Sequence, residues 1–165
     1  MLYGVARGVV PAARALEIGS YLGASSVFLA AGLQAGGGSL VCVDTWENDA
    51  MDERRRDTHA DFQRNVGALA NVVSVRKRSQ ELLSTDVAPP LTLVFLDADH
   101  SYEAVKGDFG RVAPWLVPGG LLLLHDAVHF QGVSRTIGEV LAGGGWQLDG
   151  YVDNLVALRK SAPTR

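Results

Sequence analysis

Several features that would place this chain in another class of protein are missing. It has one cysteine, Cys42, which excludes an intrachain disulfide, and the apolar run around it predicts a small core residue rather than a reactive thiol. No apolar run reaches the roughly 18 residues that span a bilayer. Residues 1–14 lack the basic start, apolar centre and small-residue cleavage site of a signal peptide. We therefore expect a cytoplasmic protein that does not enter a membrane.

The sequence also has no excess of basic charge and no internal repeat. The net charge is −3, which gives no general electrostatic reason to bind nucleic acid or an anionic membrane surface. The sequence contains no internal repeat, no linker and no low-complexity tract. Its 165 residues, 47% hydrophobic and 20% charged, suit an ordinary globular protein. We expect a single domain over 1–165, with 1–14 forming a helical or extended cover segment.

What is present is a regular alternation of short apolar strands and amphipathic helices. Strands are expected at 15–18, 39–44, 72–77, 91–98 and 121–126, with helices at about 24–33, 57–69, 80–83, 101–116 and 133–141. Pro118-Gly119-Gly120 is expected to form a turn before the fifth strand. The last two strands, 146–152 and 154–160, should pair antiparallel because their connection is so short. This order predicts an α/β fold with a Rossmann-like, doubly wound, seven-stranded sheet, mostly parallel with an antiparallel C-terminal hairpin strand.

Ligands of such sheets bind beyond the carboxyl ends of the strands, so the residues that follow each strand carry the information about function. The first strand leads into a turn from Gly19 to Gly23 and then into an apolar helix, an arrangement that presents backbone N–H groups to a ligand. A dinucleotide fingerprint needs a further glycine where Tyr21 stands, which argues against NAD or FAD. The alternative is that these glycines only make a tight turn.

Polar residues also follow the second and third strands. Asp44 stands where a carboxylate holds a ribose diol in related sheets, although a helix-capping or solvated aspartate is the alternative. Trp46 is placed to stack on a purine, or is a plain loop tryptophan. Ser79 and its neighbours would face an adenine edge, but taken alone Ser79 is better interpreted as a helix cap.

The fourth and fifth strands end in acids and histidines. Asp97 and His100 follow the fourth strand, and His125-Asp126 closes the fifth. If these strands are neighbours, the side chains converge. Two carboxylates suit Mg²⁺, and a histidine favours Mn²⁺ or Zn²⁺. The alternative is a hydrogen-bonded polar cluster without metal. His100 is placed to take a proton from a hydroxyl.

Taken together, LEIGSYLGASS, VCVDTW, VFLDADHSYEAVKGDF and PGGLLLLHD resemble the class I S-adenosylmethionine-dependent methyltransferases. They are most similar to methyltransferase family 24, which is related to metal-dependent sugar and catechol O-methyltransferases and to cephalosporin-hydroxylase-like proteins. The resemblance covers about residues 15–160. It implies a cofactor site made of Glu17, Gly19, Ser20, Tyr21, Gly23, Ser25, Asp44, Thr45, Trp46, Ser79 and Asp97.

The resemblance also implies Asp97, His125 and Asp126 as metal ligands and His100 as the general base, with related enzymes carrying another acid at His125. It therefore predicts transfer of a methyl group to a small-molecule hydroxyl, on a sugar, catechol or natural product, assisted by Mg²⁺ or Mn²⁺. The absence of the asparagine–proline–proline–aromatic motif disfavours an adenine base as acceptor. The alternatives are a fold relative without methyl transfer, a nicotinamide-dependent oxidoreductase and a partner-binding protein.

Two expectations concern the acceptor. Its specificity should reside in the loops Glu47–Arg56 and Val128–Gly132. The short N-terminal segment lacks the helices that often cover the substrate, so a lid would come from another subunit of a homo-oligomer or be missing.

Overall fold

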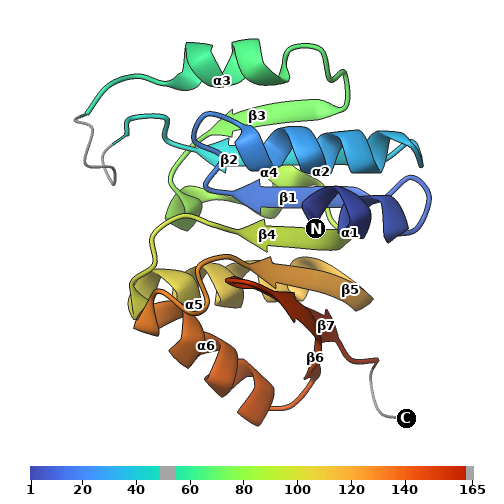
Figure 1. Ribbon diagram of the computed structural model, residues 1–165, viewed down its shortest axis with the longest axis vertical. Coiled ribbons are helices and arrows are strands. Elements are labelled where there is room, and N and C mark those ends of the chain that lie inside the picture. The colour runs from blue at the N-terminus through green and yellow to red at the C-terminus, as the bar shows by residue number, and fades with distance from the viewer. Residues whose placement is uncertain (49–54, 163–165) are drawn as a thin grey trace.

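The computed structural model, which describes residues 1–48 and 55–162, contains a seven-stranded sheet in the order β3-β2-β1-β4-β5-β7-β6 (Figure 1). Neighbouring strands from β3 to β5 pair in parallel, and β7 pairs antiparallel with both β5 and β6. The predicted fold is confirmed. The strands are β1 Arg14–Ile18, β2 Ser39–Asp44, β3 Val72–Arg76, β4 Leu91–Leu96, β5 Leu116–Leu124, β6 Trp146–Val152 and β7 Leu155–Lys160.

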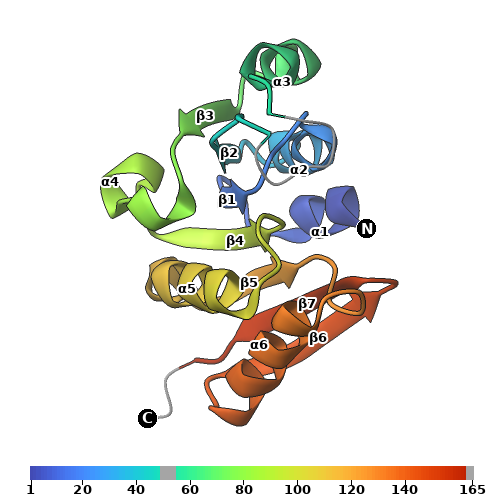
Figure 2. The ribbon, with the colours of Figure 1, turned by 90° about the vertical axis from the view of Figure 1, so that its left-hand side faces the viewer.

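Helices cover both faces of this sheet (Figure 2). One hydrophobic cluster joins the sheet to α1, α2 and α3, and a second joins it to α4, α5 and α6. Strands buried between two layers need apolar side chains on both faces, which explains runs such as LLLL in β5. The helices are α1 Leu2–Gly8, α2 Ala24–Gln34, α3 His59–Val66, α4 Ser84–Val87, α5 Tyr102–Val112 and α6 Gln131–Ala142, with 3₁₀ turns at Ser79–Glu81 and Ala113–Trp115.

Local sequence signals explain several element boundaries. Ser101 caps α5, accepting a hydrogen bond from the backbone N–H of Ala104 at its side-chain oxygen. Cys42 is completely buried in β2, as expected. The cover segment is helical over α1, which packs closely on α2 because Gly32 has no side chain: a Cβ there would lie 2.6 Å from the carbonyl oxygen of Tyr3.

The prediction of a turn at Pro118-Gly119-Gly120 is wrong. These residues lie inside β5, where Leu91 of β4 pairs with Leu116 but Leu93 pairs with Leu121. The extra residues of β5 are therefore taken up as an irregular bulge. Proline without an N–H and Gly119 at φ +80° suit a bulge as well as a turn, which is why the sequence was misleading. The fourth and fifth strands also end two residues earlier than expected, at Leu96 and Leu124.

The strand order reverses between β1 and β4, and the carboxyl ends of β1, β2, β4 and β5 lie along one edge of the sheet, to the left in Figure 1. Ligands of doubly wound sheets bind at such an edge. Most of the loop Glu47–Arg56, predicted to contact the acceptor, lies outside the described residues. Within the described part of the chain, no helix is long and apolar enough to cross a membrane.

Candidate active site

The turn between β1 and α2 packs directly on the end of β4. Gly19 has φ +91°, and a Cβ at this position would lie 2.1 Å from the carbonyl oxygen of Asp97. The N–H of Gly19 donates to the carbonyl of Val43 at 2.9 Å. Gly23, with φ +87°, packs against the side chains of Phe62 and Val66. These glycines are therefore required by contacts within the protein, and Gly19 brings the turn against the residue that ends β4.

Asp44 holds this turn in place. Its Oδ2 accepts a hydrogen bond from the N–H of Tyr21 at 2.8 Å, and its Oδ1 accepts one from the N–H of Trp46 at 2.7 Å. Tyr21 has φ +43°, a conformation that glycine adopts more readily. A carboxylate has about four acceptor positions, so Asp44 keeps capacity for the hydroxyl groups of a ligand while it fixes the turn.

The stacking role predicted for Trp46 needs correction. Trp46 has no exposed surface, its indole N–H donates to the carbonyl of Tyr21 at 2.8 Å, and its ring packs against His59 and Phe62. Its ring therefore presents no face to a purine. The neighbouring Thr45 is half-buried, and its hydroxyl accepts a hydrogen bond from the N–H of Glu47 at 3.2 Å.

The direct ligand contact predicted for Glu17 also needs correction. Glu17 is fully buried, and its two carboxylate oxygens accept hydrogen bonds from the hydroxyls of Ser25 and Ser26 in the first turn of α2. Burial raises the pKa of Glu17, while the serine hydroxyls oppose that shift. Because both oxygens are engaged and neither is exposed, Glu17 and Ser25 anchor α2 to β1.

Two serines of the predicted cofactor site have different surroundings. Ser20 is almost completely buried, and its hydroxyl lies near the carboxyl of Glu17 without a well-aligned hydrogen bond. Its position between Gly19 and Gly23 keeps Ser20 a candidate ligand contact. Ser79 begins the 3₁₀ turn after β3 and does not cap it; its side chain contacts the buried carboxyl of Asp108 on α5 instead.

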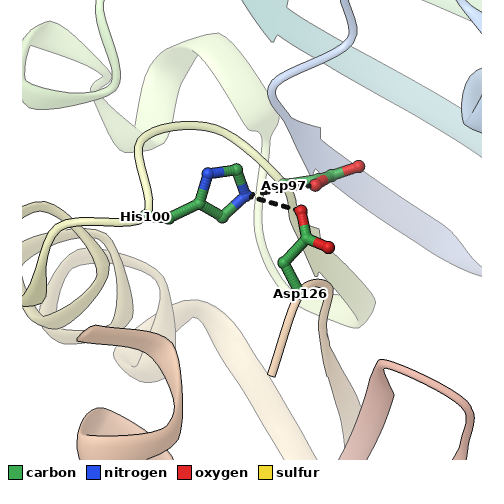
Figure 3. A group of neighbouring side chains, drawn as sticks. All are labelled: Asp97, His100 and Asp126. Carbon is green, nitrogen blue, oxygen red and sulfur yellow. Dashed lines mark ion pairs between the residues drawn. The ribbon is translucent and has the colours of Figure 1, made fainter. Parts of the chain in front are cut away.

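Asp97, His100 and Asp126 converge at the ends of β4 and β5, because these two strands are neighbours (Figure 3). His100 Nε2 lies 3.2 Å from Asp126 Oδ2 and 3.6 Å from Asp97 Oδ1. The contact with Asp97 is longer than an ordinary hydrogen bond and that with Asp126 is not aligned as one, so neither carboxylate of the described residues fixes this buried nitrogen with a well-formed hydrogen bond. The two carboxylates beside it, that of Asp97 foremost, raise the pKa of His100 although burial opposes the shift.

The donor atoms of Asp97, His100 and Asp126 all lie within 4.8 Å of one another, a spacing that suits one metal ion. His125, predicted as a ligand, is not part of this group of described residues. Its Nδ1 is hydrogen-bonded to Asp97 Oδ1 at 3.1 Å and lies 3.4 Å from Asp126 Oδ2. The structure therefore brings all four predicted residues together. His100, rather than His125, has a donor atom in the group whose spacing suits a metal ion.

Sequence reasoning missed the residue that orients Asp126. The side-chain amide of Asn154, in the turn between β6 and β7, donates to Asp126 Oδ1 at 2.8 Å. Asp126 itself has φ +58°, a conformation that only glycine adopts freely. Because β6 runs parallel to β5, the end of β6 lies at the same edge of the sheet as the end of β5. The predicted hairpin was therefore the signal in the sequence from which Asn154 could have been found.

Comparison with known proteins agrees with this geometry. A family model described as a methyltransferase domain, that of methyltransferase family 24, matches residues 16–127, which include the turn between β1 and α2 and the Asp97–His100–Asp126 group. The match covers more than half of the chain and therefore shows the family.

Solved structures share the fold at low sequence identity. The O-methyltransferase NovP is 16% identical with a TM-score of 0.77, over 98% of this chain and 78% of its own. The SAH-bound methyltransferase PaMTH1 of Podospora anserina is 16% identical with a TM-score of 0.75, over 98% and 76%. An rRNA methylase of Streptococcus thermophilus is 12% identical with a TM-score of 0.69, over 97% and 94%.

At identities of 12% to 16%, the likeness to these neighbours describes the fold alone. The glycine turn of Gly19, the carboxylate of Asp44 and the polar group on β4 and β5 occupy the segments that the family model matches. The chain belongs to methyltransferase family 24 and is an S-adenosylmethionine-dependent methyltransferase.

Proposed function

We propose that this protein transfers a methyl group from S-adenosylmethionine to a hydroxyl oxygen of a small molecule, with the help of a divalent cation. The observation that carries the proposal is the convergence of Asp97, His100 and Asp126 beside the cofactor turn. Because Gly19 packs on the backbone of Asp97, a cofactor on the turn and an acceptor at the ends of β4 and β5 would be neighbours.

In this proposal the turn and the end of β2 bind the cofactor. The spare acceptor capacity of Asp44 suits the ribose hydroxyls, and the position of Ser20 in the turn suits the amino-acid end. Thr45 and Ser79 border the adenine side, and the backbone from Gly19 to Gly23 supplies the surface on which the cofactor lies. Trp46, Glu17 and Ser25 support this surface from within the core.

The chemistry of the donor set fits a hard or borderline divalent cation. Asp97 and Asp126 would hold Mg²⁺ or Mn²⁺, with a nearby imidazole favouring Mn²⁺. Such an ion supplies Lewis-acid stabilisation of the acceptor's oxyanion. His125 hydrogen-bonds Asp97 and Asn154 hydrogen-bonds Asp126, so each carboxylate has a partner that fixes its orientation.

The methyl transfer itself needs little more than alignment, because the sulfonium is already activated. The oxygen–methyl bond forms as the sulfur–methyl bond breaks, and the hydroxyl proton passes to His100 Nε2. The products are the methyl ether, S-adenosylhomocysteine and protonated His100. A well-placed base contributes roughly 10²–10⁴-fold to the rate. In the alternative arrangement His100 completes the ligand set, and then His100→Ala would weaken metal binding as well as turnover.

A small-molecule acceptor accounts for the charge of the site better than RNA does. The group has two carboxylates, the net charge of the chain is −3, and binding to nucleic acid relies on basic side chains that neutralise phosphates. Val128 and Phe130, both exposed, lie on the loop after β5 and offer apolar contact to a ring. This loop is the part of the predicted acceptor-binding surface that the structure describes in full.

The test measures methyl transfer to a panel of sugars and catechols by mass spectrometry, and S-adenosylmethionine binding by calorimetry. Asp126→Ala should lose turnover by at least about 100-fold while binding the cofactor normally. Asp153→Ala is the matched control, because Asp153 is exposed and has the same φ of +58°. Full activity of Asp126→Ala, or of the wild type in a chelator, would contradict the role of the metal.

A further inference from the structure

His100 has an aromatic neighbour that is not a member of the Asp97–His100–Asp126 group. The ring of Phe130 stacks on the imidazole, with ring centroids 4.3 Å apart and an angle of 17° between the planes. Phe130 immediately precedes α6 and is 45% exposed. The stack covers one face of the imidazole with an aromatic ring at close to parallel orientation, an arrangement that restrains the angle of the imidazole plane.

The backbone of Phe130 is tied to the other side of the same site. Its N–H donates to the carbonyl of Asp126 at 3.1 Å, and its carbonyl accepts from the N–H of Val133 at 3.1 Å. The residue therefore bridges the end of β5 and the first turn of α6. Its ring reaches His100 from a backbone position that Asp126 fixes.

Gly132 brings the same segment against the backbone of His100. A Cβ at Gly132 would lie 2.3 Å from the carbonyl oxygen of His100 and 2.5 Å from the N of Tyr102. No side chain fits at this distance, so only glycine lets α6 approach the loop so closely. The loop that carries His100 is thus held at its backbone by Gly132 and at its ring by Phe130.

The imidazole needs such support because its polar contacts do not fix it. Among described residues, Nε2 faces two carboxylates without a well-aligned hydrogen bond, and the side chain is 24% exposed on a loop between β4 and α5. Electrostatic attraction without a directional hydrogen bond determines which edge of the imidazole faces the carboxylates, but it does not determine the tilt of the imidazole plane. An aromatic ring stacked on the imidazole face sets that tilt.

We propose that Phe130 is a positioning residue that holds the His100 imidazole with Nε2 directed at Asp97 and Asp126, and that Gly132 permits the close packing on which this stack depends. The proposal rests on the proposed function, since it assigns Phe130 a role in the reaction through His100. Phe130 acts in the same way whether His100 takes the proton or binds the metal.

The first experiment tests the stack without any activity. The chain has four histidines, whose ring protons are resolved and assigned by nuclear magnetic resonance with single histidine substitutions. Phe130→Leu should move the His100 ring protons downfield, because the ring-current shielding is lost, and leave the other three histidines in place. Phe28→Leu, at an exposed phenylalanine on α2, is the control. Unmoved His100 signals in Phe130→Leu would overturn the proposal.

The second experiment measures turnover. Phe130→Leu should lower kcat by roughly 2- to 12-fold, the range for an aromatic pair, with the KM for S-adenosylmethionine unchanged. Phe130→Trp, which keeps a stacking ring, should recover most of the loss. In a His100→Ala background Phe130→Leu should have no further effect.

These results separate the two proposals. An equal loss from Phe130→Leu with and without His100, or a change confined to the KM of the acceptor, would overturn the positioning role while leaving methyl transfer intact. If Phe130→Leu shifts the His100 signals as expected but the wild type methylates no hydroxyl, the proposed function is overturned and the stack remains established.

Discussion

Gly19→Ala tests whether the cofactor turn and the end of β4 are packed as one unit. The substitution adds one methyl group at φ +91°, 2.1 Å from the carbonyl oxygen of Asp97 and 2.7 Å from the N of Ala98. These neighbours are backbone atoms of a paired strand end, so they cannot rotate away as a side chain would. Either Asp97 or the turn has to shift.

The expected cost has two parts. A non-glycine residue in the left-handed region costs roughly 1–2 kcal/mol, and forcing a methyl group into a packed site costs about 1–3 kcal/mol. The sum is about 2–5 kcal/mol, a large share of the roughly 5–15 kcal/mol that stabilises a typical domain. The shift of Asp97 should also weaken the metal site.

Urea denaturation measures the change in unfolding free energy, and Gly37→Ala is the matched control. Gly37 has φ +72°, and a Cβ there would meet no described atom within 4 Å. The control therefore has the backbone cost without the clash, and Gly19→Ala should be destabilised by about 1–3 kcal/mol more. Equal destabilisation of the two variants would refute the close contact between turn and strand.

Three further changes have defined outcomes. Gly138→Ala, at an open position in α6, should raise the unfolding free energy by about 0.5–1 kcal/mol, measured by thermal denaturation, and a loss of stability would contradict the open geometry. Asn154→Ala removes the hydrogen bond that orients Asp126 and should lower turnover while calorimetry finds unchanged cofactor affinity; a change in affinity alone would contradict that role. Glu17→Gln removes a buried acid whose pKa burial raises above 4.5. The folded wild type therefore binds this proton more readily than the unfolded chain, and its stability falls as the pH rises from 4.5 through the raised pKa. The variant should lack this decline in urea denaturation followed from pH 4.5 upward, and an identical pH profile would contradict the burial cost.

The layout of the sheet was predictable because its rules are local. Apolar strands, glycine turns and a short final connection predict a mostly parallel sheet and its hairpin, and parallel strands bring their carboxyl ends to one edge. That is why Asp44, Asp97 and Asp126 were found at the ends of β2, β4 and β5. The bulge at Pro118 was not predictable, because a turn and a bulge require the same backbone conformations.

Side-chain packing was the part that the sequence did not reveal. Trp46 next to a candidate ribose site is typical of a stacking residue, yet the structure buries it under α3. His125 and His100 were both expected at the site, but the sequence did not reveal that His125 hydrogen-bonds Asp97 while His100 lies between Asp97 and Asp126. Phe130 carries no motif at all, and its relation to His100 emerges only from the way α6 packs on the loop after β4.

The central claim is that the ends of β4 and β5 form a divalent metal site beside the cofactor. Calorimetric titration of Mn²⁺ into the protein loaded with S-adenosylmethionine tests it most directly. One ion should bind per chain, and Asp97→Asn should abolish the binding, whereas Asp149→Asn, at an exposed aspartate of β6, should leave it unchanged. Absence of binding to the wild type, or equal binding to Asp97→Asn, would contradict the claim.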